Sequence, residues 1–119
     1  MTEETDFPNE IDDNKNKNTI RCQFCDSIIL KAKQANYSEN EFNLPLMHQK
    51  NKESVTESEV LKNYWTVDDM FTFENIGFSN TVQNKKYLIC ADCEMGPVGY
   101  HDITSKKCYV ALKRVKHVK

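Results

Sequence analysis

Two short cysteine pairs are the residues in this sequence whose type and spacing most directly predict chemistry. Cys22 and Cys25 form one C-x2-C pair, and Cys90 and Cys93 form the other. A C-x2-C pair places two thiolates on one tight turn, and two such turns supply the four ligands of a tetrahedral Zn²⁺ site. Four cysteines leave no open coordination position for a substrate, so the spacing predicts a structural rather than a catalytic zinc ion.

The distance between the two pairs indicates what the metal does for the fold. They are separated by 64 residues, far more than in ordinary zinc fingers, so a large part of the domain must form between the two turns. Structural Zn²⁺ contributes about 10–16 kcal/mol of apparent binding free energy, compared with a net stability of about 5–15 kcal/mol for a whole domain. We therefore expect the metal-free chain to be unfolded or molten.

The composition of the 119-residue chain predicts one small domain. Residues 1–19 are rich in Asn, Asp, Glu and Lys without apolar periodicity, so we expect a disordered tail followed by a zinc-clamped domain at 20–119. The sequence has no signal peptide and no run of about 20 apolar residues, which predicts a soluble, cytosolic protein. The odd count of five cysteines and their paired spacing favour reduced thiols over a disulfide framework.

Charge and motif content narrow the classes of function. The formal net charge is −2, and the lysines are interspersed with acidic residues except in a short basic C-terminal stretch, so we expect no nucleic-acid binding. His48, His101 and His117 have no partner motif, as expected of surface or satisfied histidines rather than of bases or ligands. Nothing in the sequence requires self-association, and we expect a monomer.

Short strands are expected around the cysteine turns. Alternating or apolar residues predict strands at Thr19–Cys22, Ser27–Lys33 and Lys85–Cys90, each adjoining a cysteine turn. A last strand is expected at Cys108–Val115, where the alternation predicts that the Cys108 thiol is buried. The sequence thus predicts a mainly β domain of twisted antiparallel sheets clamped by one zinc ion.

The middle of the chain gives weaker signals. Residues 34–49 predict an irregular or edge strand interrupted by Pro45. Residues 50–62 are mostly polar and predict a mobile loop, joined to a short helix at Ser58–Tyr64.

Residues 63–78 combine aromatic and acidic side chains. They hold the only Trp and three of the six Phe of the chain, in an order too irregular for a helix, and Asp68-Asp69 interrupts any continuous strand. Two interpretations follow: an aromatic core crossed by an acidic turn, or a partly exposed apolar and acidic surface that meets another protein. Burial is the commoner state of large apolar residues, whereas Asp69, Glu74 and Asn75 are difficult to place in a core.

Four blocks of the sequence resemble, in order and spacing, the mammalian-suppressor-of-Sec family, also called Rab-interacting factor. The blocks are RCQFCDSIIL, VDDMFTFENIGF, YLICADCEMGPVGYH and YVALKRV, and the match covers roughly residues 20–116. The resemblance implies a compact β-sheet fold with one structural zinc ion on the four paired cysteines. It also implies binding to nucleotide-free Rab GTPases of the exocytic branch, as a weak guanine nucleotide exchange factor or as a chaperone of the empty form.

The resemblance further implies which residues meet the GTPase. They are Asp69, Met70, Phe71, Glu74, Asn75 and Asp92. A protein of this kind regulates its partner by binding and needs no covalent chemistry of its own, so we expect no catalytic residues. It would reach membranes through the Rab that it binds.

Two alternatives belong to other classes of protein. Zinc-containing methionine sulfoxide reductases also clamp two C-x2-C turns, and Cys108 stands in a place loosely comparable to their nucleophile. The family's Arg-x-Cys-x-Asn surroundings are absent, since Lys106-Lys107 precede Cys108 and Tyr109-Val110 follow it. The other alternative is a zinc-binding adaptor that contacts a non-GTPase protein through the aromatic segment.

Overall fold

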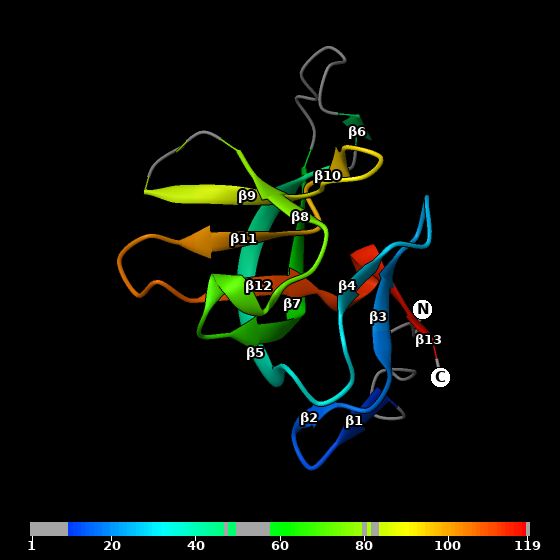
Figure 1. Cartoon of the computed structure of the whole chain (residues 1–119). Helices are drawn as coiled ribbons and strands as arrows, with labels where there is room; N and C mark the ends of the chain where they lie inside the picture. The colour runs from blue at the N-terminus through cyan, green and yellow to red at the C-terminus, as the bar shows by residue number, and fades with distance from the viewer. Residues whose placement is uncertain (1–9, 47, 50–57, 80, 82–83, 119) are drawn as a thin grey trace.

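The computed structural model describes residues 10–46, 48–49, 58–79, 81 and 84–118. These residues form short strands and the 3₁₀ turns η2 (Met70–Thr72) and η3 (Leu112–Arg114), and no helix among them is long and apolar enough to cross a membrane (Figure 1). The strands are β1 (Ile11–Asp12), β2 (Lys15–Asn16), β3 (Thr19–Cys22), β4 (Ile28–Leu30), β5 (Asn36–Pro45), β6 (His48–Gln49), β7 (Ser58–Val67), β8 (Ile76–Phe78), β9 (Lys85–Cys90), β10 (Met95–Gly96), β11 (Gly99–Asp102), β12 (Cys108–Ala111) and β13 (Val115–Val118).

Three antiparallel sheets make up the domain. The largest has eight strands in the order β1-β2-β5-β7-β12-β11-β9-β8, and the others are the three-stranded sheet β13-β3-β4 and the pair β10-β6. Figure 1 shows β3, β4 and β13 side by side, and the long curved strand β5 of the large sheet running behind β9, β11 and β12. This architecture confirms the predicted mainly β fold of antiparallel sheets.

The two faces of the large sheet carry separate clusters of buried side chains. Trp65 of β7 and Val110 of β12 belong to a core that also contains Ile20 and Leu30 of the small sheet. Because successive residues of a strand point to opposite faces, the neighbouring Tyr64 joins a second, aromatic cluster on the other face. Both sides of the β7-β12 pair are therefore buried.

The prediction of a disordered tail at residues 1–19 is wrong for residues 10–19. Strands β1 and β2 form a hairpin on the edge of the large sheet, and Asn16 in β2 is fully buried. The Asn16 amide donates to the carbonyl groups of Asn18 (3.0 Å) and Lys31 (2.9 Å), and its oxygen accepts from the Ala35 N–H (2.9 Å). A satisfied buried amide can thus order a stretch whose composition is polar. Residues 1–9 lie outside the described part of the chain.

The predictions for the middle of the chain are corrected in part. The helix expected at Ser58–Tyr64 is absent: these residues belong to the ten-residue strand β7. The irregular strand expected at 34–49 is confirmed as the ten-residue β5, which ends at Pro45 and pairs with β7 from Asn36↔Thr66 to Pro45↔Ser58 around one bulge. Pairing between β5 and β7, which are distant in sequence, stabilises strands that the local residue pattern predicts only weakly. Of the predicted mobile loop, residues 58–62 lie in β7, and residues 50–57 lie outside the described residues.

The C-terminal strand is divided into two parts. β12 ends at Ala111, and the turn η3 carries the chain from the large sheet to β13, which pairs with β3. Cys108 is fully buried, as the alternation predicts. The continuous strand expected to Val115 is therefore wrong, because the chain changes sheets there.

Candidate functional site

The four paired cysteines come together at the ends of β3 and β9. Cys22 is the last residue of β3 and Cys90 the last of β9, and each partner cysteine lies in the turn that follows. The four sulfur atoms all lie within 4.8 Å of one another. The Cys22–Cys93 sulfurs are 3.6 Å apart, and the Cys25–Cys90 sulfurs are 3.5 Å apart.

The same backbone conformation builds both cysteine turns. The Asp26 N–H donates to the Cys22 carbonyl (3.0 Å), and the Glu94 N–H donates to the Cys90 carbonyl (2.9 Å). Asp26 and Glu94 both have positive φ angles, 68° and 63°. These left-handed residues end each turn and direct both of its thiols to one side.

The spacing of the sulfur atoms fits one metal ion. With a metal–sulfur distance of about 2.3 Å, a tetrahedral thiolate site has sulfur–sulfur separations of about 3.8 Å. Burial raises the pKa of the Cys90 thiol and raises that of Cys93 to about 12, so a bound cation must displace protons from these ligands. When bound, such an ion joins β3 to β9 across the small and large sheets.

A polar contact joins the two cysteine turns. The Ser27 hydroxyl donates a hydrogen bond to the carboxylate of Asp92, which is exposed in the second turn. The Ser27 oxygen also lies 3.3 Å from the Cys25 sulfur. Asp92, which sequence resemblance places on a protein-binding surface, is therefore part of the support of the cysteine cluster.

The segment after β7 carries three of the six predicted partner-binding residues, Asp69, Met70 and Phe71, at the short turn η2. The Asp69 carboxylate accepts a hydrogen bond from the Phe71 N–H (2.9 Å) and so caps η2. The Phe71 side chain is 88% exposed and that of Met70 is 36% exposed. By contrast, Phe73 is half-buried against the core.

The aromatic segment is partly core and partly exposed, so the core interpretation is confirmed for part of it, and contact of the exposed part with another protein stays a prediction. Trp65 and Val67 are core residues of β7, and Ile76 and Phe78 are half-buried against the same core. The exposed residues are Asp68, Asp69, Met70 and Phe71 at and just before η2, together with Asn75.

Glu74 and Asn75 tie this segment to β4. The Glu74 N–H donates to the Ile29 carbonyl (2.9 Å), and the Asn75 amide donates to the Ile28 carbonyl (2.9 Å). The Asn75 carbonyl in turn accepts from the Ala91 N–H (2.8 Å) in the second cysteine turn. Asn75 therefore connects η2 to the cysteine cluster through backbone contacts.

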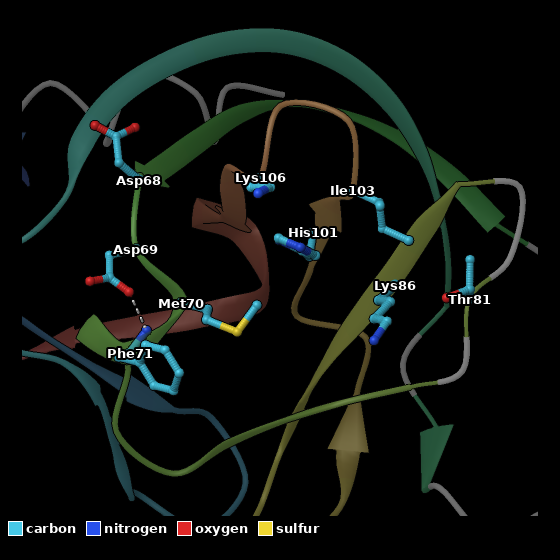
Figure 2. Close-up of a pocket in the computed structure, with 9 residues that line it drawn as sticks. All are labelled: Asp68, Asp69, Met70, Phe71, Thr81, Lys86, His101, Ile103 and Lys106. Atoms are coloured by element: carbon cyan, nitrogen blue, oxygen red, sulfur yellow. Dashed lines mark hydrogen bonds between the residues drawn. The ribbon is translucent and has the colours of Figure 1, made fainter.

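A pocket of about 540 Å³ opens beside η2 (Figure 2). Asp69, Met70 and Phe71 line it, but Glu74, Asn75 and Asp92 do not. The other lining residues are Asp68, Thr81, Lys86, His101, Ile103 and Lys106.

Sequence reasoning missed the part of this pocket that lies across from η2. Lys86 and His101 are cross-strand neighbours in β9 and β11, and His101 is a cross-strand neighbour of Cys108 in β12. The signal was the hairpin formed by residues 99–111, which places His101 beside Cys108. Without the register, His101 stands alone in the sequence.

Comparison with known proteins decides the family. A family model described as Mss4 protein matches residues 15–117. A Drosophila melanogaster protein named guanine nucleotide exchange factor MSS4 homolog is 56% identical over 119 residues, covering 98% of each chain. The chain belongs to the Mss4 family. A Schizosaccharomyces pombe protein of the same name is 31% identical over 84 residues, which cover 70% of this chain and 80% of that relative.

In this Mss4-family chain, Cys108 lacks the setting of a nucleophile. The thiol is fully buried, and burial, with a smaller contribution from Asp69, raises its pKa to about 11. His101 Nδ1 lies 3.2 Å from the sulfur and covers it from the pocket side. A reductase would need an accessible thiolate of low pKa at this position. Membership of the Mss4 family and this burial both argue against the reductase alternative.

Proposed function

We propose that this chain binds nucleotide-free Rab GTPases of the exocytic branch and promotes GDP release as a weak guanine nucleotide exchange factor. The same binding would stabilise the empty GTPase, as a chaperone does, during vesicle transport. The observation that carries the proposal is Phe71, an 88% exposed aromatic residue on a capped turn, in a chain similar to two proteins that are named guanine nucleotide exchange factor MSS4 homologs.

The composition of the exposed turn suits a protein partner. Met70 and Phe71 supply an apolar centre, and Asp68 and Asp69 supply an acidic rim. Interfaces combine an apolar, largely aromatic centre with a polar rim, and charge on the rim affects the association rate more than the final affinity. We assign Asp69, Met70 and Phe71 to direct contact. Glu74 and Asp92 extend this surface, and Asn75 contributes by positioning the turn.

Linkage explains how binding accelerates GDP release. If the chain binds the empty GTPase more tightly than the GDP-bound form, the affinity of the GTPase for GDP must fall by the same factor. Each tenfold preference corresponds to about 1.4 kcal/mol. The incoming nucleotide then displaces the chain reciprocally. No nucleophile or general base of this chain takes part, because deforming the nucleotide pocket of the partner is sufficient.

The metal that we propose for the cysteine cluster is Zn²⁺ in a structural role, held by Cys22, Cys25, Cys90 and Cys93. Four thiolates at tetrahedral spacing are the ligands that structural zinc prefers. The cluster fixes the turn that carries Asp92, and the backbone bond between Asn75 and Ala91 extends this support toward η2. We propose that the protein acts as a monomer in the cytosol and meets membranes through its Rab partner.

Complex formation with empty and loaded GTPase tests the proposal. Size-exclusion chromatography of the chain with a panel of exocytic Rabs should give a stable complex after the nucleotide has been removed, and none with GDP bound. Addition of GDP should dissociate the complex. If no Rab of the panel forms a complex in its empty state, the proposal is wrong and an adaptor for a non-GTPase protein becomes the better interpretation.

A further inference from the structure

The pocket beside η2 has an acidic side and a basic side. Asp68 and Asp69 lie on one side in Figure 2, and Lys86 lies on the opposite side, with Lys106 between them at the back. The acidic side is the turn after β7. The basic side comes from β9 and from the loop between β11 and β12, which are remote from η2 in sequence.

Apolar groups lie between the two charged sides. The Met70 side chain extends toward the middle of the pocket, where His101 lies, and Ile103 approaches from the opposite side (Figure 2). His101 is held in place by the Cys108 sulfur at 3.2 Å and by an edge-on contact with the Phe78 ring, whose centroid is 5.8 Å away. His101 is therefore positioned by two neighbouring side chains, whereas Met70 is an unbranched, adaptable side chain at the rim of the pocket.

Hydrogen bonds fix the basic side before any partner binds. The Ile103 N–H donates to the Asn84 carbonyl (3.2 Å), which attaches the loop to the start of β9. The Lys106 N–H donates to the Asp102 carbonyl (2.7 Å), and the Asp102 carboxylate accepts from the Thr104 N–H (3.0 Å). The loop that presents Lys106 is thus a tight hydrogen-bonded turn.

The two pocket lysines differ from several other basic side chains of the chain. Lys31, Lys33 and Lys116 each pair with a carboxylate. Within the described residues, neither Lys86 nor Lys106 forms an ion pair, although Asp68 and Asp69 line the same pocket. Their positive charge remains available to a group that enters the pocket.

From these observations we propose that the pocket receives a segment of the GTPase in which an apolar side chain stands next to a carboxylate. The apolar side chain contacts Met70 and Ile103, and the carboxylate pairs with Lys86 and Lys106. This inference rests on the proposed function and adds a second, basic contact region to the surface on η2. Since Asp68 and Asp69 would repel the same carboxylate, the two charged sides admit the segment in one orientation only.

The test is the association rate with nucleotide-free Rab, measured by stopped-flow fluorescence at low and at physiological salt. The test variant is Lys86→Glu/Lys106→Glu. The control is Lys85→Glu/Lys107→Glu, which changes the net charge equally at the neighbouring positions, outside the pocket lining. Cysteine-bound metal and thermal unfolding should match the wild-type chain in both variants.

The pocket variant should associate about tenfold more slowly than the control variant at low salt, with the difference shrinking as salt screens the charges. If it is less than threefold slower than the control, the lysines act only through overall charge and the inference is wrong. In that case, a wild-type chain that still binds empty Rab leaves the proposed function intact. If the wild-type chain binds no Rab, both the proposed function and this inference fail.

Discussion

Ser27 and Asp92 are 65 positions apart in sequence, yet a hydrogen bond between their side chains joins the two cysteine turns. Ser27 also contacts the Cys25 sulfur. Asp92 thus acts on the orientation of the cysteine cluster, in addition to the role in partner binding that we propose. Outer groups of this kind orient the ligands of metal sites and commonly change metal affinity when they are replaced.

Replacing Ser27 should weaken metal binding. In Ser27→Ala the Asp92 carboxylate and the Cys25 sulfur lose their shared partner, and we expect metal affinity to fall about tenfold or more. Competition with a chromogenic chelator measures this directly. Asp92→Asn is the matched variant, because its amide oxygen still accepts from Ser27, and it should keep metal affinity within about threefold of wild type. Equal metal retention in Ser27→Ala and wild type would contradict the assigned role of the contact.

Removal of the metal should unfold the domain. The cysteine cluster joins β3 to β9, and an ion worth about 10–16 kcal/mol exceeds or equals the net stability of most domains. After complete chelation under reducing conditions, we expect circular dichroism to show no cooperative thermal transition, and re-addition of Zn²⁺ to restore it. A sharp transition in the metal-free chain would show that the hydrophobic core suffices alone.

Stability should fall as the pH drops below the ordinary pKa of histidine. The Trp65 indole N–H donates to Nε2 of His117 at 3.0 Å, which requires a neutral imidazole. Burial lowers the pKa of His117, opposed by the charge of Glu10. Below about pH 6.5 the unfolded chain therefore binds a proton that the folded chain does not, and stability decreases until the pH passes the folded pKa.

Urea unfolding between pH 5.5 and 7.5 tests this linkage with His117→Gln as the control. The glutamine amide oxygen can accept from Trp65 but does not titrate, so the variant should lose the histidine part of the pH dependence. Both chains keep the four cysteines, so metal release at low pH affects them alike. Parallel pH profiles for the two chains would show that His117 does not contribute.

The buried guanidinium of Arg114 should matter more to stability than its ion-pair partner. Arg114 is 4% exposed and donates to the carbonyls of Pro45 (3.0 Å) and Pro97 (2.7 Å), besides pairing with Glu59 at 3.0 Å. Arg114→Met leaves both carbonyls without this donor, and we expect a loss of about 2–4 kcal/mol in urea unfolding. Glu59 is half-exposed, so Glu59→Gln should cost about 1 kcal/mol or less. A larger loss of stability in Glu59→Gln than in Arg114→Met would show that the ion pair, and not the bonds to the two carbonyls, is the main contribution of Arg114.

The cysteine cluster and the strands beside it could be predicted from the sequence, because cysteine spacing and residue alternation are local patterns. They place the cluster of Cys22, Cys25, Cys90 and Cys93 and the strands beside it. The hairpin around Asn16 could not be predicted, because it is held in place by hydrogen bonds to residues 15 and 19 positions further along the chain. The strand β7 was missed at Ser58 for a similar reason, since β5 supplies its pairing.

The candidate protein-binding site also has one part that the sequence indicated and one part that only the structure revealed. Resemblance pointed to six residues. The structure puts Asp69, Met70 and Phe71 at one pocket, whereas Glu74, Asn75 and Asp92 lie outside its lining. Lys86 and His101 could not be assigned to the site from the sequence, because only the register of β9 and β11 brings them to that pocket.

We expect the chain to accelerate GDP release through the exposed residues at η2. Release of a fluorescent GDP analogue from exocytic Rabs should be faster with the wild-type chain, and Phe71→Ala should lose most of the acceleration while changing stability by about 0.5 kcal/mol or less. Val60→Ala truncates another exposed apolar side chain, 59% exposed on β7, and should accelerate release as the wild-type chain does. Phe73→Ala should instead lose about 1–3 kcal/mol of stability. No acceleration for any Rab, or full acceleration by Phe71→Ala, would show that η2 does not promote GDP release.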